Sequence, residues 1–264
     1  MHGSNSVLKF QLLPSSFESD GSPSARQHLA CLVVNDLVAV DAGSLAMAAT
    51  DEMRRSLRDV VLTHAHLDHI AGLPLFIDDL FATLKRPVTV HALNEVIDVL
   101  ERDIFNWSVF PRFSELDAGY GPPIKYSSIQ PNVEFQIADL TFQAFAADHK
   151  VPSAGYLISD DNGSVAVSGD SASLAALIAA VAGRDDMRAV LVECAFPNGL
   201  GAIAQNSHHM TPSVLADQLA SLAADCPVFV INIKPNYREK VVAELSELSI
   251  PRLEVMQVGK CYFW

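Results

Sequence analysis

The sequence lacks the features that mark exported and membrane-spanning proteins. No apolar stretch in its 264 residues approaches the roughly 20 residues of a membrane span. The first residues, Met1 to Ser6, show no basic stretch followed by an apolar run, so we expect no signal peptide. The four cysteines have no C-x-x-C spacing and predict reduced, buried thiols in a cytoplasmic protein: Cys31, Cys194, Cys226 and Cys261.

Positive charge is also scarce. The chain has 18 Lys and Arg against 31 Asp and Glu, which gives a formal net charge of −13. A protein that binds a nucleic-acid polymer normally carries a basic surface that contacts the phosphates, and this sequence has no cluster of Lys and Arg. The charge therefore argues against a nucleic-acid partner, but not against a small phosphate ester, because metal ions supply local positive charge. Half of the residues are hydrophobic, enough for a large core, so we expect one domain over residues 1–264.

What the sequence does contain is a hexapeptide dense in metal-binding side chains. The run from His64 to His69 has the pattern H-x-H-x-D-H and follows an apolar, β-prone run at 60–63. Imidazole suits zinc and similar first-row metals, whereas carboxylate suits harder ions. Two such ligand types so close together favour two metal ions in one site. We expect these ligands on a loop that a buried strand holds in place.

Strands and helices are predicted around this hexapeptide. An Asn35-Asp36 turn between two apolar runs indicates a hairpin. Asn94 is placed to cap a helix with apolar residues at i, i+3 and i+7, and Thr211-Pro212 to begin another. The remaining expected elements are strands at 9–14, 28–34, 37–40, 88–91, 140–145, 155–158, 165–168 and 190–192, and helices at 72–85 and about 174–181.

H-x-H-x-D-H after a short apolar strand resembles the signature of the metallo-β-lactamase superfamily, and later parts of that pattern follow in order along nearly the whole chain. The resemblance implies an α/β (α+β) fold, a four-layered αββα sandwich with metals at one end of its two sheets. It makes Asp41 a support for the metal loop, with a strand-end turn residue as the alternative. Asp170 corresponds to a carboxylate that bridges two metals, and a helix N-cap is compatible with that role. The pattern has no ligand at His91, which we expect to be structural.

Three further segments narrow the resemblance to the class II 3′,5′-cyclic-nucleotide phosphodiesterases. They are the aromatic run 105–111, E-C-A-F-P-N at 193–198, and H-M-T-P at 209–212. Ala195 and Met210 stand where that family has Ser and Leu. A late-strand His of the family corresponds to Asn232, whose neutral amide oxygen is a weaker ligand for zinc. The second metal is then held loosely, replaced by a harder ion such as manganese, or completed by another residue or water.

The resemblance implies two divalent metal ions, with zinc expected and manganese or iron as alternatives. The first would be bound by His64, His66 and His149, the second by Asp68, His69 and Asn232, with Asp170 between them. It also implies hydrolysis of cAMP or cGMP to the 5′-monophosphate by a metal-bound hydroxide. Asp68 and His209 are the candidate catalytic residues, and His209 would protonate the leaving oxygen, with helix-cap packing as its alternative. The candidate substrate-binding residues are His208, Lys234, Trp107 and Asn198.

Other functions fit parts of this pattern. The same fold serves RNA-processing phosphodiesterases, including tRNA 3′-processing endonucleases, and hydrolases of thioesters or lactones. A non-catalytic nucleotide-binding protein that lost its second metal through Asn232 is a further alternative. The expected partners are a small cyclic nucleotide and, because dimers are common in the superfamily, a second copy of the chain.

Overall fold

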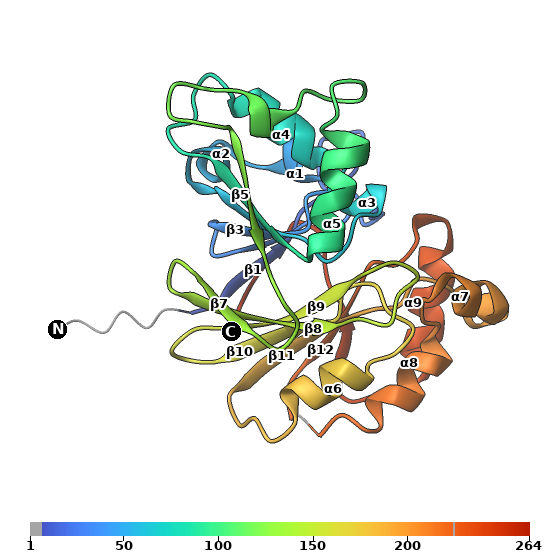
Figure 1. The fold of residues 1–264 in the computed structure, drawn as a ribbon. Coiled ribbons are helices and arrows are strands. Elements are labelled where there is room, and N and C mark those ends of the chain that lie inside the picture. Colours follow the sequence, from blue (N-terminus) through green and yellow to red (C-terminus); the bar gives the residue numbers. More distant parts are fainter. Residues whose placement is uncertain (1–6, 224) are drawn as a thin grey trace. The chain divides into compact units, whose positions relative to one another are not determined.

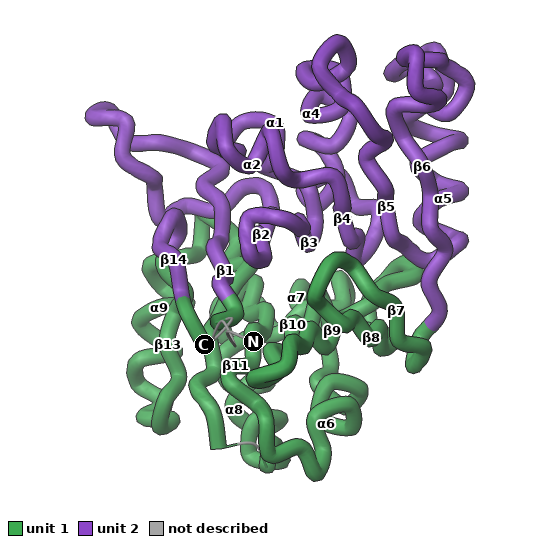
Figure 2. Tube along the Cα trace, turned by 90° about the vertical axis from the view of Figure 1, so that its left-hand side faces the viewer, with its two compact units in different colours: residues 1–8, 131–257, 263–264 green, residues 9–130, 258–262 purple. Residues whose placement is uncertain are grey.

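The computed structural model describes residues 7–223 and 225–264. Its chain divides into two compact units, which Figure 2 colours separately. Unit 1 comprises the N-terminal residues up to 8, residues 131–257 and residues 263–264, and unit 2 comprises residues 9–130 and 258–262. Each unit is built around one mixed sheet, of seven strands as far as the described residues show. The expectation of a single domain over residues 1–264 stays a prediction.

The sheet of unit 2 has the strand order β14-β1-β2-β3-β4-β5-β6. Strands β1 to β3 pair antiparallel, whereas β3 to β6 pair parallel. The strands are β1 (Lys9–Leu12), β2 (Leu32–Val34), β3 (Val38–Val40), β4 (Asp59–Val61), β5 (Val88–Ala92), β6 (Ile124–Ser128) and β14 (Cys261–Phe263). The helices are α1 (Leu45–Ala48), α2 (Asp51–Ser56), α3 (Leu67–Ile70), α4 (Gly72–Leu80) and α5 (Asn94–Val99), with a π-helical turn at Leu100–Ile104 and a 3₁₀ turn at Phe113–Glu115.

Most predicted elements of unit 2 are confirmed, with differences at their ends. The hairpin forms where expected, and both turn residues are left-handed, Asn35 with φ 51° and Asp36 with φ 56°. Residues 35–37 connect β2 to β3, and the Leu37 N–H donates to the Val34 carbonyl at 3.0 Å, so Asn35 and Asp36 are the central residues of a tight turn. Asn and Asp tolerate the left-handed backbone that both positions adopt. The helix expected over 72–85 ends at Leu80. Asn94 as a cap is wrong: Leu93 occupies the N-cap position, and Asn94 is the first helical residue.

In unit 2 the direction of the parallel strands places two loops at opposite ends of these strands. We call these two sides of the sheet the carboxyl edge and the amino edge. His64 to His69 follow the carboxyl end of β4. Because β4, β5 and β6 run in the same direction, α5 and the π-helical turn must return to the amino edge before β6 begins, as Figure 1 shows. The aromatic run 105–111 therefore lies at the amino edge. There Phe113 stacks on Phe81, which follows α4, with ring centroids 6.1 Å apart.

The sheet of unit 1 has the order β13-β12-β11-β10-β9-β8-β7. Strands β7 to β10 pair antiparallel and β10 to β13 pair parallel. The strands are β7 (Glu134–Ile137), β8 (Leu140–Ala146), β9 (Ala154–Ser159), β10 (Ser164–Val167), β11 (Met187–Glu193), β12 (Val228–Ile231) and β13 (Leu253–Val255). The helices are α6 (Ala175–Val181), α7 (Gly201–Ser207), α8 (Pro212–Leu219) and α9 (Arg238–Glu247), with 3₁₀ turns at Asn198–Leu200 and Pro235–Tyr237.

Three helices cover one face of this sheet (Figure 1). Leu177 of α6, Leu215 of α8 and Val241 of α9 belong to one buried apolar cluster with residues of β10, β11 and β12. Strands β10, β11 and β12 are accordingly apolar almost throughout, as expected of parallel strands covered on both faces. Cys194 is buried in the same cluster, which confirms its expected packing role.

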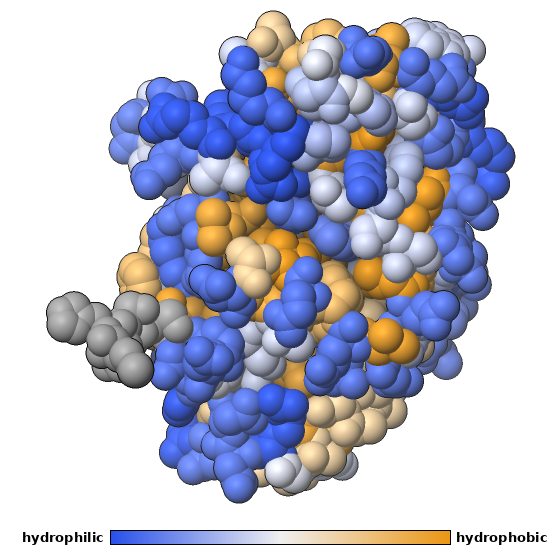
Figure 3. Space-filling model, turned by 60° about the vertical axis from the view of Figure 1, so that its left-hand side comes forward, coloured by the Kyte–Doolittle hydropathy of each residue, from blue (hydrophilic) through white to orange (hydrophobic). Residues whose placement is uncertain are grey.

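On the face in Figure 3, hydrophilic residues predominate, and hydrophobic residues gather in several groups between them. None of the helices in the described part of the chain is both long and apolar enough to cross a membrane.

Candidate metal centre

The metal-binding hexapeptide lies at the carboxyl edge of β4, as predicted. His66 occupies the N-cap position of the short helix α3, and this single turn carries Asp68 and His69. The three histidine rings crowd together, with the His64 centroid 4.5 Å from that of His66 and 4.1 Å from that of His69. One strand end and one helical turn thus gather three imidazoles in unit 2.

Asp41 holds this loop in place. Its carboxylate accepts hydrogen bonds from the Thr63 backbone N–H (2.8 Å) and hydroxyl, and from His69 Nδ1 (2.7 Å). Asp41 also comes directly after β3 and has a left-handed φ of 60°. Its hydrogen bonds favour the supporting role among the two that the sequence left open. The Thr63 hydroxyl lies 2.9 Å from His64 Nδ1, so one carboxylate and one hydroxyl orient two of the imidazoles.

The loop that carries the metal-binding hexapeptide packs so closely against residue 43 that only glycine fits at this position. The Gly43 N–H bonds to the Ala30 carbonyl at 2.7 Å, and the Ala30 N–H bonds to the Asp68 carbonyl at 2.8 Å. A Cβ at Gly43 would lie 2.0 Å from that Asp68 oxygen, which no side chain tolerates. The backbone around Asp68 is therefore fixed by close approach as well as by hydrogen bonds.

We expect the substitution Asp41→Asn to weaken metal binding about 10- to 100-fold, the usual effect of removing a group that orients a metal-binding imidazole. The amide cannot accept from both Thr63 and His69, so it also leaves a buried polar group unpaired, which costs about 1–3 kcal/mol. Competition with a chelator measures the first effect, and thermal unfolding of the metal-stripped protein the second. Asp78→Asn, on the exposed face of α4, is the matched control. Unaltered metal affinity in D41N would contradict the supporting role.

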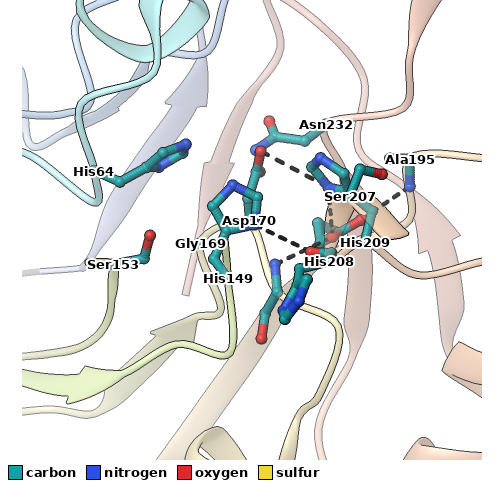
Figure 4. Close-up of polar contacts among 12 residues, drawn as sticks. His64, His149, Ser153, Gly169, Asp170, Ala195, Ser207, His208, His209 and Asn232 are labelled. Carbon is teal, nitrogen blue, oxygen red and sulfur yellow. Dashed lines mark hydrogen bonds and ion pairs between the residues drawn. The ribbon is translucent and has the colours of Figure 1, made fainter. Parts of the chain in front are cut away.

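In unit 1, three neighbouring parallel strands end in polar side chains. Asp170 follows β10, Glu193 ends β11, and Asn232 follows β12. Because β10, β11 and β12 are parallel neighbours, these side chains meet at one edge of the sheet. The Asn232 amide nitrogen donates to Asp170 Oδ1 at 2.8 Å, an interaction drawn in Figure 4. Asp170 is not the cap of α6, since Leu174 occupies that position.

Two histidines join this edge. His149 comes from the loop after β8, and His209 from the loop after α7, with ring centroids 5.1 Å apart. His149, Asp170 and His209 each offer a ligand atom, and these atoms all lie within 4.8 Å of one another. Figure 4 shows the three side chains converging. The structure thus makes His209 a further candidate ligand as well as a candidate proton donor.

Glu193 is a candidate site residue to which the sequence analysis gave no role. It is 0% exposed, and its carboxylate accepts from the backbone N–H groups of Ser171 (3.1 Å) and Ala195 (2.9 Å) and from His209 Nδ1 (2.9 Å). A carboxylate at the end of an otherwise apolar strand is the signal that could have identified it. Burial raises its pKa above the ordinary carboxyl value.

The pKa of His209 is raised above 6.5. Burial acts to lower it, but the hydrogen bond and charge of Glu193, helped by the charge of Asp170, outweigh that effect. A raised pKa means that the ring keeps its second proton to higher pH than a free imidazole does. This arrangement suits a group that donates a proton near neutral pH.

The donor sets fit divalent metal ions. His69, His149 and His209 each donate Nδ1–H to an oxygen acceptor: the Asp41 carboxylate, the His208 carbonyl at 3.1 Å, and the Glu193 carboxylate. Metal-binding histidines usually hold one ring nitrogen in this way, which leaves Nε2 as the ligand atom. The imidazole and carboxylate groups at each carboxyl edge are therefore of the types that bind first-row metal ions.

The proposed substrate-binding residues fall in different places. His208 lies beside Asp148 (Nδ1 to Oδ1, 3.1 Å), and Lys234 is close enough for its charge to act on His209. The Asn198 side-chain oxygen accepts from Ser213 N–H at 2.8 Å, so it holds the start of α8. Trp107 is exposed at the amino edge of its sheet. His91 is buried and bonds to Asp59 at 3.0 Å, consistent with a structural role. A substrate role for Trp107 and Asn198 stays a prediction.

Comparison with known protein families identifies the superfamily of this chain. The model of the β-lactamase superfamily domain matches residues 38–230. The chain belongs to this superfamily. A protein from Yersinia pestis, named a probable 3′,5′-cyclic-nucleotide phosphodiesterase, is 27% identical over 228 residues, covering 74% of this chain and 64% of the relative. The chain therefore spans less than two thirds of that relative's length. A nuclear ribonuclease Z of Triticum aestivum is 32% identical over 98 residues, 37% of this chain and 52% of the relative.

Solved structures show the fold. Unliganded yeast PDE1 matches with a TM-score of 0.75 and 17% identity, covering 98% of this chain and 99% of that one. The metallo-β-lactamase fold protein YhfI from Bacillus subtilis matches with a TM-score of 0.75 and 16% identity, covering 97% and 99%. The predicted fold class, the αββα sandwich of the metallo-β-lactamase type, is confirmed.

Proposed function

We propose that this chain is a metal-dependent phosphodiesterase that hydrolyses 3′,5′-cyclic nucleotides to 5′-monophosphates. The observation that carries the proposal is the His209–Glu193 pair beside Asp170. Phosphodiester hydrolysis needs a proton donor for the leaving oxygen close to groups that stabilise phosphoryl charge. A buried carboxylate holds the His209 ring at 2.9 Å, next to a carboxylate suited to metal. The 27% identity to a protein named as a phosphodiesterase supports the same substrate class.

The metal ligands that we propose are those implied by the family resemblance. His64, His66 and His149 would hold one ion, Asp68, His69 and Asn232 would hold a second, and Asp170 would be a further ligand. Zinc is expected at imidazole-rich positions, with manganese or iron as alternatives. When bound, such ions activate water and offset charge on the phosphoryl oxygens.

The protein side chains position the substrate and move one proton. His209 donates from Nε2 to the leaving 3′ oxygen, while Glu193 accepts Nδ1–H and keeps the ring from turning. The Asn232 amide holds Asp170 from one side. Lys234 adds positive charge near His209, where a phosphate would be favoured.

The test is to measure metal per chain by elemental analysis and to assay the same sample on cAMP with and without added Mn²⁺. Near two metals per chain, with cAMP converted to 5′-AMP, would support the proposal and show that Asn232 is tolerated. One metal or none, with no turnover after Mn²⁺ addition, would exclude cAMP as the substrate.

An RNA phosphodiesterase is the second candidate, favoured by the similarity to the wheat ribonuclease Z. The net charge of −13 argues against it, because RNA binding needs compensating positive charge. A precursor tRNA substrate, assayed on the same sample, separates the two, and thioester and lactone substrates test the carbonyl hydrolases. Metal without any turnover would favour a nucleotide-binding protein. The cytoplasmic location and the homodimer stay predictions.

A further inference from the structure

A cavity of about 590 Å³ lies beside His209 in unit 1. Helix α7 forms one wall, the start of α8 another, and the loops after β8 and β10 complete it. This volume is within the range of about 300–1,000 Å³ for small-molecule sites. A ligand that fills it would place its reacting group at the His209 ring.

Most of the cavity lining favours an uncharged ligand. Of its nine lining residues, all of them in the described part of the chain, none is Lys or Arg. Its titratable groups are His209, beside which the reacting group would lie, and the pair of Asp148 and His208, 3.1 Å apart. Apolar surface comes from Ala172, Ala204 and Val214. Away from His209 a phosphate would be unfavourable, since no Lys or Arg of the lining would offset its charge.

The polar groups of the cavity are suited to a nucleoside. Gln205 of α7 lines it, and its amide has both donors and an acceptor. This combination matches the N6 and N7 edge of adenine, whereas the corresponding guanine edge offers acceptors and is usually bound by Arg or Lys. We propose that the cavity binds the nucleoside of the substrate, with the base against the apolar walls and Gln205 at its edge. The inference rests on the proposed function and predicts a preference for cAMP over cGMP.

Gly201 offers a way to fill the cavity without disturbing the fold. It lines the cavity, its φ of −53° is helical, and a Cβ placed there meets no heavy atom within 4 Å. A leucine at this position therefore adds bulk to the lining of the cavity without a clash at its Cβ. Gly199 is a matched control two residues earlier: it is exposed, outside the lining, and its Cβ would be in ordinary contact with Lys240.

The experiment compares Gly201→Leu and Gly199→Leu on two phosphodiesters. cAMP carries a nucleoside, whereas methyl p-nitrophenyl phosphate does not. We expect Gly201→Leu to raise KM for cAMP at least about 10-fold, the loss that 1.4 kcal/mol of binding produces. Its turnover of methyl p-nitrophenyl phosphate, and both activities of Gly199→Leu, should stay within about 2-fold of the unmodified protein. Equal losses on both substrates, or no loss on cAMP, would overturn the nucleoside site.

A second pair of variants tests the base contact. Gln205→Ala should reduce the ratio of kcat/KM for cAMP over cGMP about 10-fold, while the exposed neighbour Asn206→Ala should leave it unchanged. A guanine preference in the unmodified protein, or a ratio unaffected by Gln205→Ala, would refute the role of Gln205.

Binding of adenosine, measured by calorimetry on the unmodified protein and on Gly201→Leu, separates the two proposals. Adenosine has no phosphate and needs no catalysis. Failure of the phosphodiesterase function would abolish turnover of both esters yet leave adenosine binding sensitive to Gly201→Leu. Failure of the cavity proposal would leave turnover intact and adenosine unbound, or bound equally by both proteins.

Discussion

The variant Asp170→Ala is expected to lose both tight metal binding and turnover. Asp170 is buried at the carboxyl edge of β10 and accepts a hydrogen bond from Asn232. Its possible ligand atom lies within 4.8 Å of those of His149 and His209. Removal of Asp170 takes away a carboxylate that we propose as a metal ligand, and metal stabilisation of a phosphoryl transition state supplies several kcal/mol. Because each 1.36 kcal/mol is a factor of ten, we expect kcat on cAMP to fall about 10³-fold or more. Elemental analysis and the cAMP assay measure the two effects on one sample.

Asp161→Ala is the matched control, since Asp161 lies exposed in the loop after β9. A thermal unfolding curve for each variant shows whether the fold survives. Full metal content and full activity in a folded D170A protein would remove Asp170 from the site.

The second large effect is expected for His209→Ala. Loss of a general acid lowers turnover typically 10²- to 10⁴-fold. Metal content should fall much less than turnover, because His209 is not among the residues that we propose as metal ligands. Added imidazole should restore part of the activity by supplying the missing donor. Replacing the exposed His28 provides the control.

Two results would change this interpretation. Unaltered turnover in H209A would exclude His209 from the mechanism. A loss of metal in proportion to the loss of turnover would instead make His209 a ligand, as its position with His149 and Asp170 allows.

Much of this geometry could be predicted because it depends on local sequence. An apolar run followed by H-x-H-x-D-H defines both a buried strand and its loop, and Asn35-Asp36 defines its own turn. Apolar parallel strands that end in Asp170 and Asn232 were likewise visible along the chain. The length of α4 was overestimated, because its apolar residues continue past Leu80 into a turn that the helix does not include.

What the sequence could not supply were pairings between distant residues. Glu193 meets His209 across 16 positions, through a strand end, a helix and a loop. The direction of a returning helix also decides where a segment lies. The sequence named Trp107 as a candidate substrate-binding residue but did not show at which end of the strands it lies, and the parallel pairing places its aromatic run at the amino edge of the sheet of unit 2. Periodicity describes the faces of an element and not the edge at which it ends.

The hydrogen bonds at Nδ1 of the metal-binding histidines make metal binding depend on pH. In His69 and His149, both proposed ligands, the Nδ1 proton is committed to an oxygen acceptor, so an added proton and a metal ion compete for the same atom, Nε2. Each imidazolium that takes up metal must release a proton. Protons therefore compete with the metal for the histidine nitrogens. The fraction of protein with bound metal depends on both the pH and the free metal concentration.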